Sequence, residues 1–145
     1  VRASQEIKLG IVIADPKELS LRKVLNYGHT LGHALESLSY RSPFPMLHGE
    51  AVAWGMRAEA RLSVEFGGMK ASTYDEIAEG LANFNFPAPQ MTFERDLWRQ
   101  MLHQDKKNAG KDLRLSLLAG IGVCSPDIDV PMEAVLKVAE EELLK

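Results

Sequence analysis

The sequence predicts a mainly α-helical domain that contains several helices and one small β-hairpin. Apolar residues recur at helical spacing in most segments between turns, whereas a period-two alternation occurs only over residues 113–117. A length of 145 residues, with 46% apolar and 26% charged residues, is typical of one globular domain. We therefore expect residues 1–145 to form a single helical domain.

Proline and capping residues divide the N-terminal part of the chain. Apolar residues over 7–13 indicate a first helix that ends at Asp15-Pro16. Asp15 can accept a backbone N–H, Pro16 suits a first helical position, and Glu18 can close a capping box. These signals predict a second, mostly helical segment over residues 19–38.

The middle of the chain carries three further helix patterns. Prolines at 43 and 45 break the chain before a long helix expected over residues 48–66, which Gly67-Gly68 ends. Thr73 and Glu76 form a second capping-box pattern, and the helix they begin ends in the turn at residues 85–89. Residues 93–103 are amphipathic at helical spacing and predict another helix.

The C-terminal third contains the strand signal. Residues 113–117 alternate Leu-Arg-Leu-Ser-Leu, and residues 120–123 could supply a short partner strand. Asp129-Val130-Pro131 then predicts the start of a terminal helix through Leu144, with an apolar stripe along one side.

Composition excludes several functional classes. A net charge of −3 and a pI near 5.8 give no broad positive field, so we expect no nucleic-acid partner. No run reaches the ~18 apolar residues of a membrane span, and no signal-peptide pattern is present. Cys124, as a single cysteine, cannot form an internal disulfide, which fits a reducing compartment, and we predict a cytoplasmic location. The chain opens on Val1, and we expect it to be part of a longer protein.

Three of the four histidines fall within twenty residues of one another. On a helix, His29 and His33 project from one face, so both could reach a single metal ion. An antiparallel return of the chain could bring His48 opposite His29, and two imidazoles with one carboxylate form a common catalytic zinc set. A surface role for the His29/His33 pair stays open. The spacing differs from His-Glu-x-x-His, which disfavours a metalloprotease.

The residues around the histidines suggest ligands and close contacts. Glu36 and Glu50 could supply the carboxylate, although Glu50 also fits the first turn of a helix, where negative charge is favoured. Glycines beside the histidines, at positions 28, 32 and 49, suggest close approach of a backbone or ligand. Cationic and amide donors that could hold a phosphate or a polyhydroxy acid are Lys8, Arg22, Asn26, Lys106 and Lys107.

Residues 22–36 resemble the signature of the 3-dehydroquinate synthase family; they read Arg-Lys-Val-Leu-Asn-Tyr-Gly-His-Thr-Leu-Gly-His-Ala-Leu-Glu. Residues 47–52, Leu-His-Gly-Glu-Ala-Val, resemble a second element of the same family. Lys8 ahead of Asp15-Pro16, then Asp105-Lys106-Lys107 and Gly120-Ile121-Gly122, recur in the same order. The resemblance therefore covers nearly the whole chain.

The resemblance implies an enzyme activity. The family converts 3-deoxy-D-arabino-heptulosonate 7-phosphate into 3-dehydroquinate and phosphate in the shikimate pathway of aromatic amino acid biosynthesis, as a phosphate-eliminating carbon–oxygen lyase. It uses NAD and a divalent metal, usually zinc and alternatively cobalt. His29 and His48 match its two metal-ligating histidines, whereas His33 matches a histidine that contacts the substrate near the departing phosphate. This pairing differs from the His29/His33 pair that spacing alone favours.

Further residue roles follow from the same resemblance. Substrate-binding positions are matched by Lys8, Arg22, Asn26 and His33, and by Lys106 or Lys107. Among these, Lys8, Asn26 and His33 are expected to take part in catalysis. The family binds NAD mainly through an N-terminal α/β domain, so we expect no NAD-binding residue within residues 1–145 and no activity of this chain alone. That domain and the sugar phosphate are the expected partners, and the full-length enzyme is expected to form a homodimer.

Two alternatives are open. The first is a domain of another sugar-phosphate cyclase, which would make an inosose or a valiolone from a different substrate. The second is a non-catalytic helical module, in which the histidines are structural and the apolar stripe of residues 135–144 binds a partner.

Overall fold

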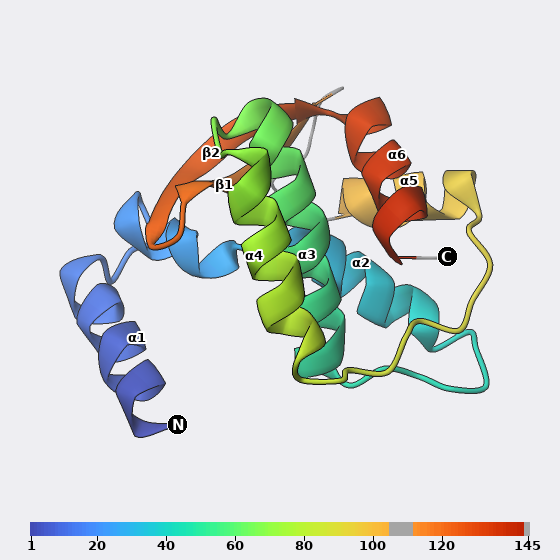
Figure 1. The fold of residues 1–145 in the computed structure, drawn as a ribbon, viewed down its shortest axis with the longest axis horizontal. Coiled ribbons are helices and arrows are strands. Elements are labelled where there is room, and N and C mark those ends of the chain that lie inside the picture. Colours follow the sequence, from blue (N-terminus) through green and yellow to red (C-terminus); the bar gives the residue numbers. More distant parts are fainter. Residues whose placement is uncertain (105–111, 144–145) are drawn as a thin grey trace.

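The expected mainly helical fold with one hairpin is confirmed by the computed structural model, which describes residues 1–104 and 112–143. Within these ranges the elements are α1 (Arg2–Ala14), the 3-10 helix η1 (Leu21–Asn26), α2 (His29–Ser39), α3 (His48–Phe66), α4 (Ala71–Ala82), α5 (Arg95–Gln104), β1 (Asp112–Gly120), β2 (Val123–Pro131) and α6 (Met132–Leu143). The central helix is α3, which contacts α2, α4, β1 and α6 (Figure 1). No helix in the described part of the chain is long and apolar enough to cross a membrane.

The main core lies between α2, α3, α5, α6 and the inner face of the hairpin. Leu35 of α2, Leu62 of α3 and Leu115 of β1 are each almost completely buried in it. Complete burial of one such side chain stabilises the fold by about 1.5–3 kcal/mol. The histidine-bearing helix α2 is therefore held by the same packing that stabilises the whole domain.

The apolar stripe of the terminal helix belongs to this core. Val135, Leu136, Val138, Ala139 and Leu143 of α6 are all buried among residues of the other helices and β1. These side chains are not exposed to a partner, so the structure contradicts the interpretation of the stripe as a docking surface. The last residue of the predicted stripe, Leu144, lies outside the described residues.

Glycines allow α2 and α3 to approach closely. A Cβ on Gly55 of α3 would lie 2.1 Å from the carbonyl oxygen of Gly28, and a Cβ on Gly32 of α2 would lie 2.9 Å from Cα of Val52. Any larger side chain at these positions would push the two helices apart. The predicted close approach is confirmed for Gly28 and Gly32, whereas a Cβ on Gly49 would meet nothing within 4 Å.

The predicted helix start at Asp15-Pro16 is wrong. Asp15 lies at the C-terminal end of α1, and its carboxylate accepts N–H groups of Leu19, Ser20 and Arg22, which closes a turn instead of capping a helix. These hydrogen bonds, with that from Arg22 the largest effect, lower the pKa of Asp15. The predicted helix over residues 19–38 is accordingly split into η1 and α2, because Gly28 takes a positive φ of 81° just before His29.

The other helix boundaries were predicted with varying success. The expected helix over residues 48–66 is confirmed at both ends as α3. In contrast, α4 begins at Ala71 with Lys70 before it, so the predicted capping box at Thr73 and Glu76 lies inside the helix. The helix expected over residues 93–103 is present as α5, with its start two residues later.

The second strand of the hairpin was placed wrongly. Ile121 and Gly122 form the turn, and β2 extends from Val123 through Pro131, so α6 begins at Met132 and not at Asp129. Prolines and aspartates are rare in strands, which hid β2 from the sequence pattern. A bulge accommodates two of them: Leu115 pairs with Ile128 and Leu117 with Ser125, which leaves Pro126 and Asp127 opposite a single residue.

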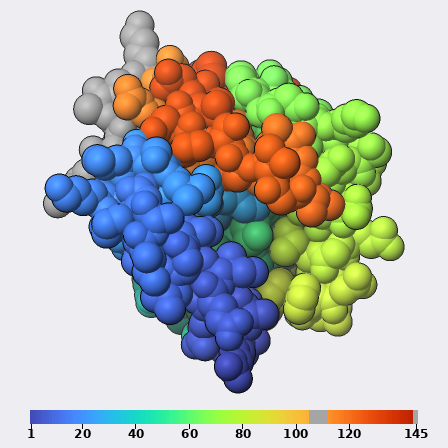
Figure 2. All heavy atoms as spheres, turned by 90° about the vertical axis from the view of Figure 1, so that its left-hand side faces the viewer, coloured from blue at the N-terminus to red at the C-terminus, as the bar shows by residue number. Residues whose placement is uncertain are grey.

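The N-terminal helix lies apart from the rest of the domain. None of its residues is buried, and Ile7, Leu9 and Ile13 are each more than half exposed. Figures 1 and 2 show α1, in dark blue, projecting from the body of the domain below η1 and the hairpin. Its attachment to the rest of the described structure is chiefly through η1.

A candidate metal centre of three histidines

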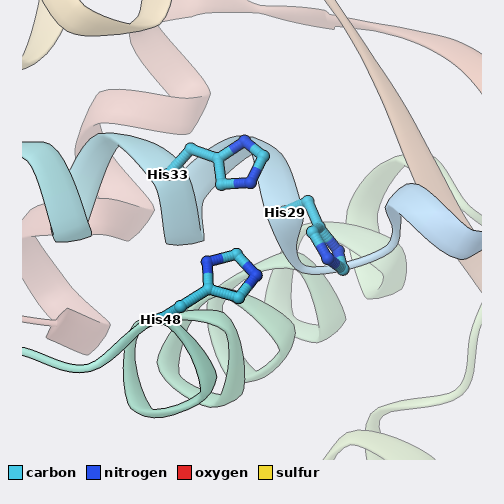
Figure 3. Close-up of side chains that lie close together, drawn as sticks. All are labelled: His29, His33 and His48. Carbon is cyan, nitrogen blue, oxygen red and sulfur yellow. The ribbon is translucent and has the colours of Figure 1, made fainter.

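Three histidine side chains meet where α2 and α3 begin (Figure 3). His29 is the first residue of α2, His33 follows one turn later, and His48 is the first residue of α3. One ring nitrogen from each lies within 4.8 Å of the others, and the ring centroids are 5.4 to 5.7 Å apart. The predicted placement of His48 opposite His29 is confirmed. Three imidazoles this close can hold one divalent ion such as Zn²⁺ or Co²⁺.

Two of these histidines have an oxygen partner on their Nδ1 atom. Nδ1 of His29 lies 3.2 Å from the carbonyl oxygen of Tyr27, and Nδ1 of His48 lies 2.9 Å from a carboxylate oxygen of Glu36. Metal-ligating histidines usually donate their second N–H in this way, which orients the ring and leaves Nε2 for the metal. Within residues 1–104 and 112–143, no such hydrogen bond is found for His33.

The two candidate carboxylates therefore have different positions. Glu36 contacts His48 directly, with its oxygen on the imidazole nitrogen. Glu50 accepts the backbone N–H of Leu47 at 2.9 Å at the start of α3. This agrees with the alternative prediction that Glu50 is an acidic residue in the first turn of a helix. Neither belongs to the group of three donors.

The environment of His29 favours its neutral form. Partial burial is the largest cause that lowers the pKa of His29, and the nearby His33, His48 and Lys8 lower it further. The hydrogen bond to Tyr27 acts in the opposite direction. A neutral imidazole is the form that binds a metal ion, so the surroundings of His29 suit a ligand.

A buried carboxyl group holds the turn that carries His29. Glu59 of α3 is completely buried, and its two oxygens accept the N–H of Gly28 at 2.6 Å and of Leu31 at 3.2 Å. Burial raises the pKa of Glu59 to about 8, against the effect of these backbone hydrogen bonds. Glu59 was not predicted as a site residue from the sequence. Its signal was a charged residue four positions after Gly55 on the apolar face of α3.

The adjoining pocket combines predicted and unpredicted residues. It is small, about 100 Å³, and its lining residues are Lys23, Asn26, His29, Thr30, His33, Arg114, Leu115, Ser116 and Asp127. The structure thus brings Asn26 together with two of the histidines. An ion pair between Lys23 and Asp127 and a hydrogen bond from Ser116 Oγ to the Lys23 carbonyl join the hairpin to η1 beside it.

The hairpin residues of this pocket could not have been found from the sequence pattern. The alternation over residues 113–117 predicts a strand but does not tell which helix its faces meet. The bulge at Asp127 lay in a segment that was not predicted as a strand. These contributions therefore became visible only with the tertiary contacts.

The remaining predicted site residues have three different outcomes. Lys8 is exposed on α1, and Arg22 donates through Nη1 to the Pro16 carbonyl at 3.3 Å; neither lines the pocket. Asn26 lines it and donates through Nδ2 to Glu18 at 2.9 Å. Lys106 and Lys107 fall outside the described residues.

A family model described as 3-dehydroquinate synthase C-terminal matches residues 1–108. Curated relatives named 3-dehydroquinate synthase include those of Helicobacter pylori strain P12, 36% identical over 138 residues, and Dehalococcoides mccartyi strain BAV1, 38% identical over 135 residues. The alignments cover 95% and 93% of this chain but only 40% and 37% of the relatives, so the chain spans well under half their length.

Two solved structures share the fold. A 2-deoxy-scyllo-inosose synthase complexed with carbaglucose-6-phosphate, NAD+ and Co2+ matches with a TM-score of 0.71 at 24% identity, over 87% of this chain and 36% of that one. A 2-epi-5-epi-valiolone synthase from Streptomyces hygroscopicus with NAD+ and Zn2+ matches with a TM-score of 0.73 at 24% identity, over 97% and 39%. The fold agrees with the family model, which matches residues 1–108. The chain belongs to the 3-dehydroquinate synthase C-terminal family.

Proposed function

We propose that this chain is the metal- and substrate-binding part of a 3-dehydroquinate synthase. Such an enzyme converts 3-deoxy-D-arabino-heptulosonate 7-phosphate into 3-dehydroquinate and phosphate in the shikimate pathway. The observation that carries the proposal is the histidine cluster, in which His29 and His48 each have an oxygen partner on Nδ1 and face one another. The names of the curated relatives support the choice of reaction.

The donor set fits a divalent metal. We assign His29 and His48 as ligands, because their Nδ1 hydrogen bonds direct Nε2 toward a shared ion. Imidazole nitrogen suits both Zn²⁺ and Co²⁺, the ions named in the two solved relatives. When bound, NAD would supply transient oxidation of a ring alcohol, and the metal would polarise the alcohol and ketone oxygens.

The other polar residues would bind and orient the substrate. Asn26 lines the pocket next to His29 and His33, where its amide can bind a substrate hydroxyl. His33 is exposed beside the ligands, and we assign it the transfer of a proton near the departing phosphate. We assign charged contacts with the phosphate and carboxylate to Lys8, Arg22 and Lys106 or Lys107.

The proposal includes a longer protein. The chain spans 36 to 40% of its curated relatives, and we propose that the complete protein also has an N-terminal α/β domain that binds NAD. Without that domain the chain would bind substrate groups and metal but would not react. We further propose that the complete enzyme is a homodimer.

Phosphate release tests the reaction. The chain would be incubated with 3-deoxy-D-arabino-heptulosonate 7-phosphate, NAD and zinc, alone and together with the N-terminal domain of a relative. A third sample would be the complete protein of a relative, which controls for the assay. A fourth would contain the His33→Ala variant of this chain with the same N-terminal domain.

Each outcome is informative. Release in the supplemented sample only, with loss on His33→Ala, supports the assigned reaction and the need for a second domain. Release by the chain alone would contradict the assignment of NAD to another domain. No release in the supplemented sample, with an active complete relative and demonstrated association of the two parts, would contradict the reaction itself.

A different sugar-phosphate cyclase is the second candidate, because the two solved relatives make an inosose and a valiolone by name. They are 24% identical to this chain, whereas the curated dehydroquinate synthases named above are 36% and 38% identical. A panel of six-carbon and seven-carbon sugar phosphates in the supplemented assay separates the two. Turnover of another sugar phosphate in preference to the heptulosonate would favour the second candidate.

A further inference from the structure

We propose that Glu59 is a positioning residue for the metal centre. Its buried carboxyl group fixes the first turn of α2 on α3 and thereby sets the place of His29 relative to His48. The inference rests on the proposed metal-binding function of these two histidines. Glu59 does not line the pocket, and it would act on His29 through the backbone.

The contacts of Glu59 surround His29 along the chain. One oxygen accepts the N–H of Gly28, the residue before His29, and the other accepts the N–H of Leu31, two residues after it. The N–H of Thr30, between these two, also lowers the pKa of this carboxyl group and so favours its charged form. The backbone on both sides of His29 is therefore held by one side chain. A shift of this turn would move the imidazole of His29 with it.

Glu59 replaces the usual cap of the helix. The first N–H groups of a helix have no partner within it, and a short polar side chain at the N-cap normally accepts one of them. At the start of α2 that position is Gly28, which makes no side-chain cap and has a φ of 81°. A Cβ there would lie 2.3 Å from Cγ of Met56. A local cap is thus excluded by the close packing of α3, and the acceptor comes from α3 itself.

This origin of the cap matters for the geometry of the site. His48 is the first residue of α3, and Glu59 lies eleven positions later on the same continuous helix. The helix α3, which carries His48, therefore also holds the turn that carries His29 through hydrogen bonds to Glu59. A second contact of the same kind supports it, since the hydroxyl group of Tyr27 donates to the Met56 carbonyl of α3 at 2.7 Å.

The surroundings of Glu59 show what its carboxyl group does at this position. Removing a carboxyl group from water is costly unless hydrogen bonds compensate for the lost hydration. The neighbours of Glu59 on α3, Ala58, Ala60 and Leu62, are all apolar and fully buried. A residue of that kind at position 59 would leave the N–H groups of Gly28 and Leu31 without this acceptor.

The test compares Glu59→Gln with a matched control. Gln keeps the length of the side chain but replaces one accepting oxygen by an NH₂ group, which cannot accept the N–H of Gly28 or Leu31. The control is Ser63→Ala, one turn later on α3. Ser63 is also buried, and its hydroxyl oxygen accepts the N–H of Leu118 in the hairpin at 2.9 Å, away from α2. Ser63→Ala also removes the hydrogen bond from the Ser63 hydroxyl group to the backbone carbonyl of Glu59 at 2.7 Å. Both variants therefore remove buried hydrogen bonds of α3, but only Glu59→Gln removes an acceptor of the His29 turn.

Two readouts are needed for each variant of the chain. The first is amide hydrogen exchange in the metal-free protein, where Gly28, Thr30 and Leu31 should exchange about tenfold faster or more in Glu59→Gln and unchanged in Ser63→Ala. The second is titration with Co²⁺, followed by its absorption spectrum. We expect a dissociation constant about tenfold higher or more and an altered spectrum in Glu59→Gln only.

The outcomes separate this inference from the proposed function. If Glu59→Gln loosens the turn but binds Co²⁺ with the wild-type affinity and spectrum, Glu59 is merely structural and the inference is wrong. If both variants weaken Co²⁺ binding equally, general loss of stability explains the effect and the inference is also wrong. If the wild-type chain binds no Co²⁺, the proposed metal function fails, and the hydrogen exchange still shows whether Glu59 holds the turn.

Discussion

Glu36 and His48 are joined by a hydrogen bond of 2.9 Å between a carboxylate oxygen and Nδ1 of the imidazole. Glu36 lies three residues before the end of α2, and His48 is the first residue of α3. This hydrogen bond therefore joins the two helices directly. It fixes the tautomer with the proton on Nδ1, which leaves Nε2 as the free donor atom for a metal. In the proposed metal centre, this bond would make Glu36 a residue that tunes a ligand without touching the ion.

Replacement of Glu36 by Gln should therefore weaken metal binding. The amide can still accept the Nδ1–H bond, but it lacks the negative charge that raises the basicity of the imidazole. We expect the zinc dissociation constant to rise about tenfold, as measured by competition with a chromophoric chelator. Glu50→Gln is the matched control, because Glu50 accepts a backbone N–H at the start of α3 and not an imidazole N–H. Equal affinities of the two variants would argue against the tuning role.

Alanine variants of the histidines test the assignment of the ligands. Removal of His29 or His48 should raise the Co²⁺ dissociation constant by about a hundredfold or more, because each would remove one of two protein ligands. His33→Ala should keep affinity within about threefold while phosphate release in the supplemented assay falls by about a hundredfold or more.

The fourth histidine provides the control for these variants. His103 is exposed on α5 and is not part of the three-histidine group, so His103→Ala should bind Co²⁺ as the wild type does. A loss of affinity in His33→Ala as large as that in His29→Ala would contradict the two-histidine assignment. It would instead support binding by the pair that is four residues apart on α2, or by all three.

The close crossing of α2 and α3 predicts a strong effect at Gly55. In Gly55→Ala the new methyl group would meet the Gly28 carbonyl and the backbone of Gly32, so the helices must separate. We expect the free energy of unfolding to fall by about 1–3 kcal/mol in urea denaturation, with weaker Co²⁺ binding because the His29 turn moves.

Gly80 of α4 is the matched control for Gly55. It also lies inside a helix, but a Cβ at this position meets nothing within 4 Å. Gly80→Ala should therefore gain stability, by up to about 1 kcal/mol, because alanine has the higher helix propensity. If Gly55→Ala behaves as Gly80→Ala does, α2 and α3 do not pack closely at Gly55.

The sequence predicted those parts of the fold whose signals are local. The helix α3 has a proline-rich segment before it, an acid in its first turn and two glycines after it, and all of these signals agree on its boundaries. Asp15 shows the limit of such reasoning. Its sequence context is that of a helix cap, yet its carboxylate binds three N–H groups of a turn, which depends on the path of the chain after it.

The residues of the candidate site also fall into those with a signal in the sequence and those without one. The histidines could be found because their type and spacing suggest chemistry, and the resemblance paired His29 with His48 where spacing alone favoured His33. Glu59 could not be given a role, since its partners are backbone N–H groups of another helix and leave no trace in residue type. Of the pocket residues from the hairpin, Asp127 was missed because β2 has a bulge at Pro126 and Asp127. Arg114, Leu115 and Ser116 lie on a strand that was predicted, but the alternation does not tell which helix that strand faces.

The buried carboxyl group of Glu59 also predicts how stability depends on pH. Burial raises the pKa of Glu59 from 4.5 to about 8 in the folded protein. Between these values the folded protein keeps a proton that the unfolded chain has released, so unfolding releases a proton and a rise in pH favours it. The free energy of unfolding should therefore fall as the pH rises from about 5 to about 8, with a slope on the order of 1 kcal/mol per pH unit.

Glu59→Gln isolates this contribution, since the histidines and other titrating groups are the same in both proteins. Tyr27 and Cys124 also lie near Glu59, and burial with the charge of Glu59 raises the pKa of each, so neither ionises in this range to reverse the trend. Urea denaturation of both proteins in metal-free buffer across this range gives the difference. The stability of the wild type relative to Glu59→Gln should decline steadily toward the upper end. A difference that is constant with pH would mean that Glu59 titrates with an ordinary pKa and is solvated in the folded protein.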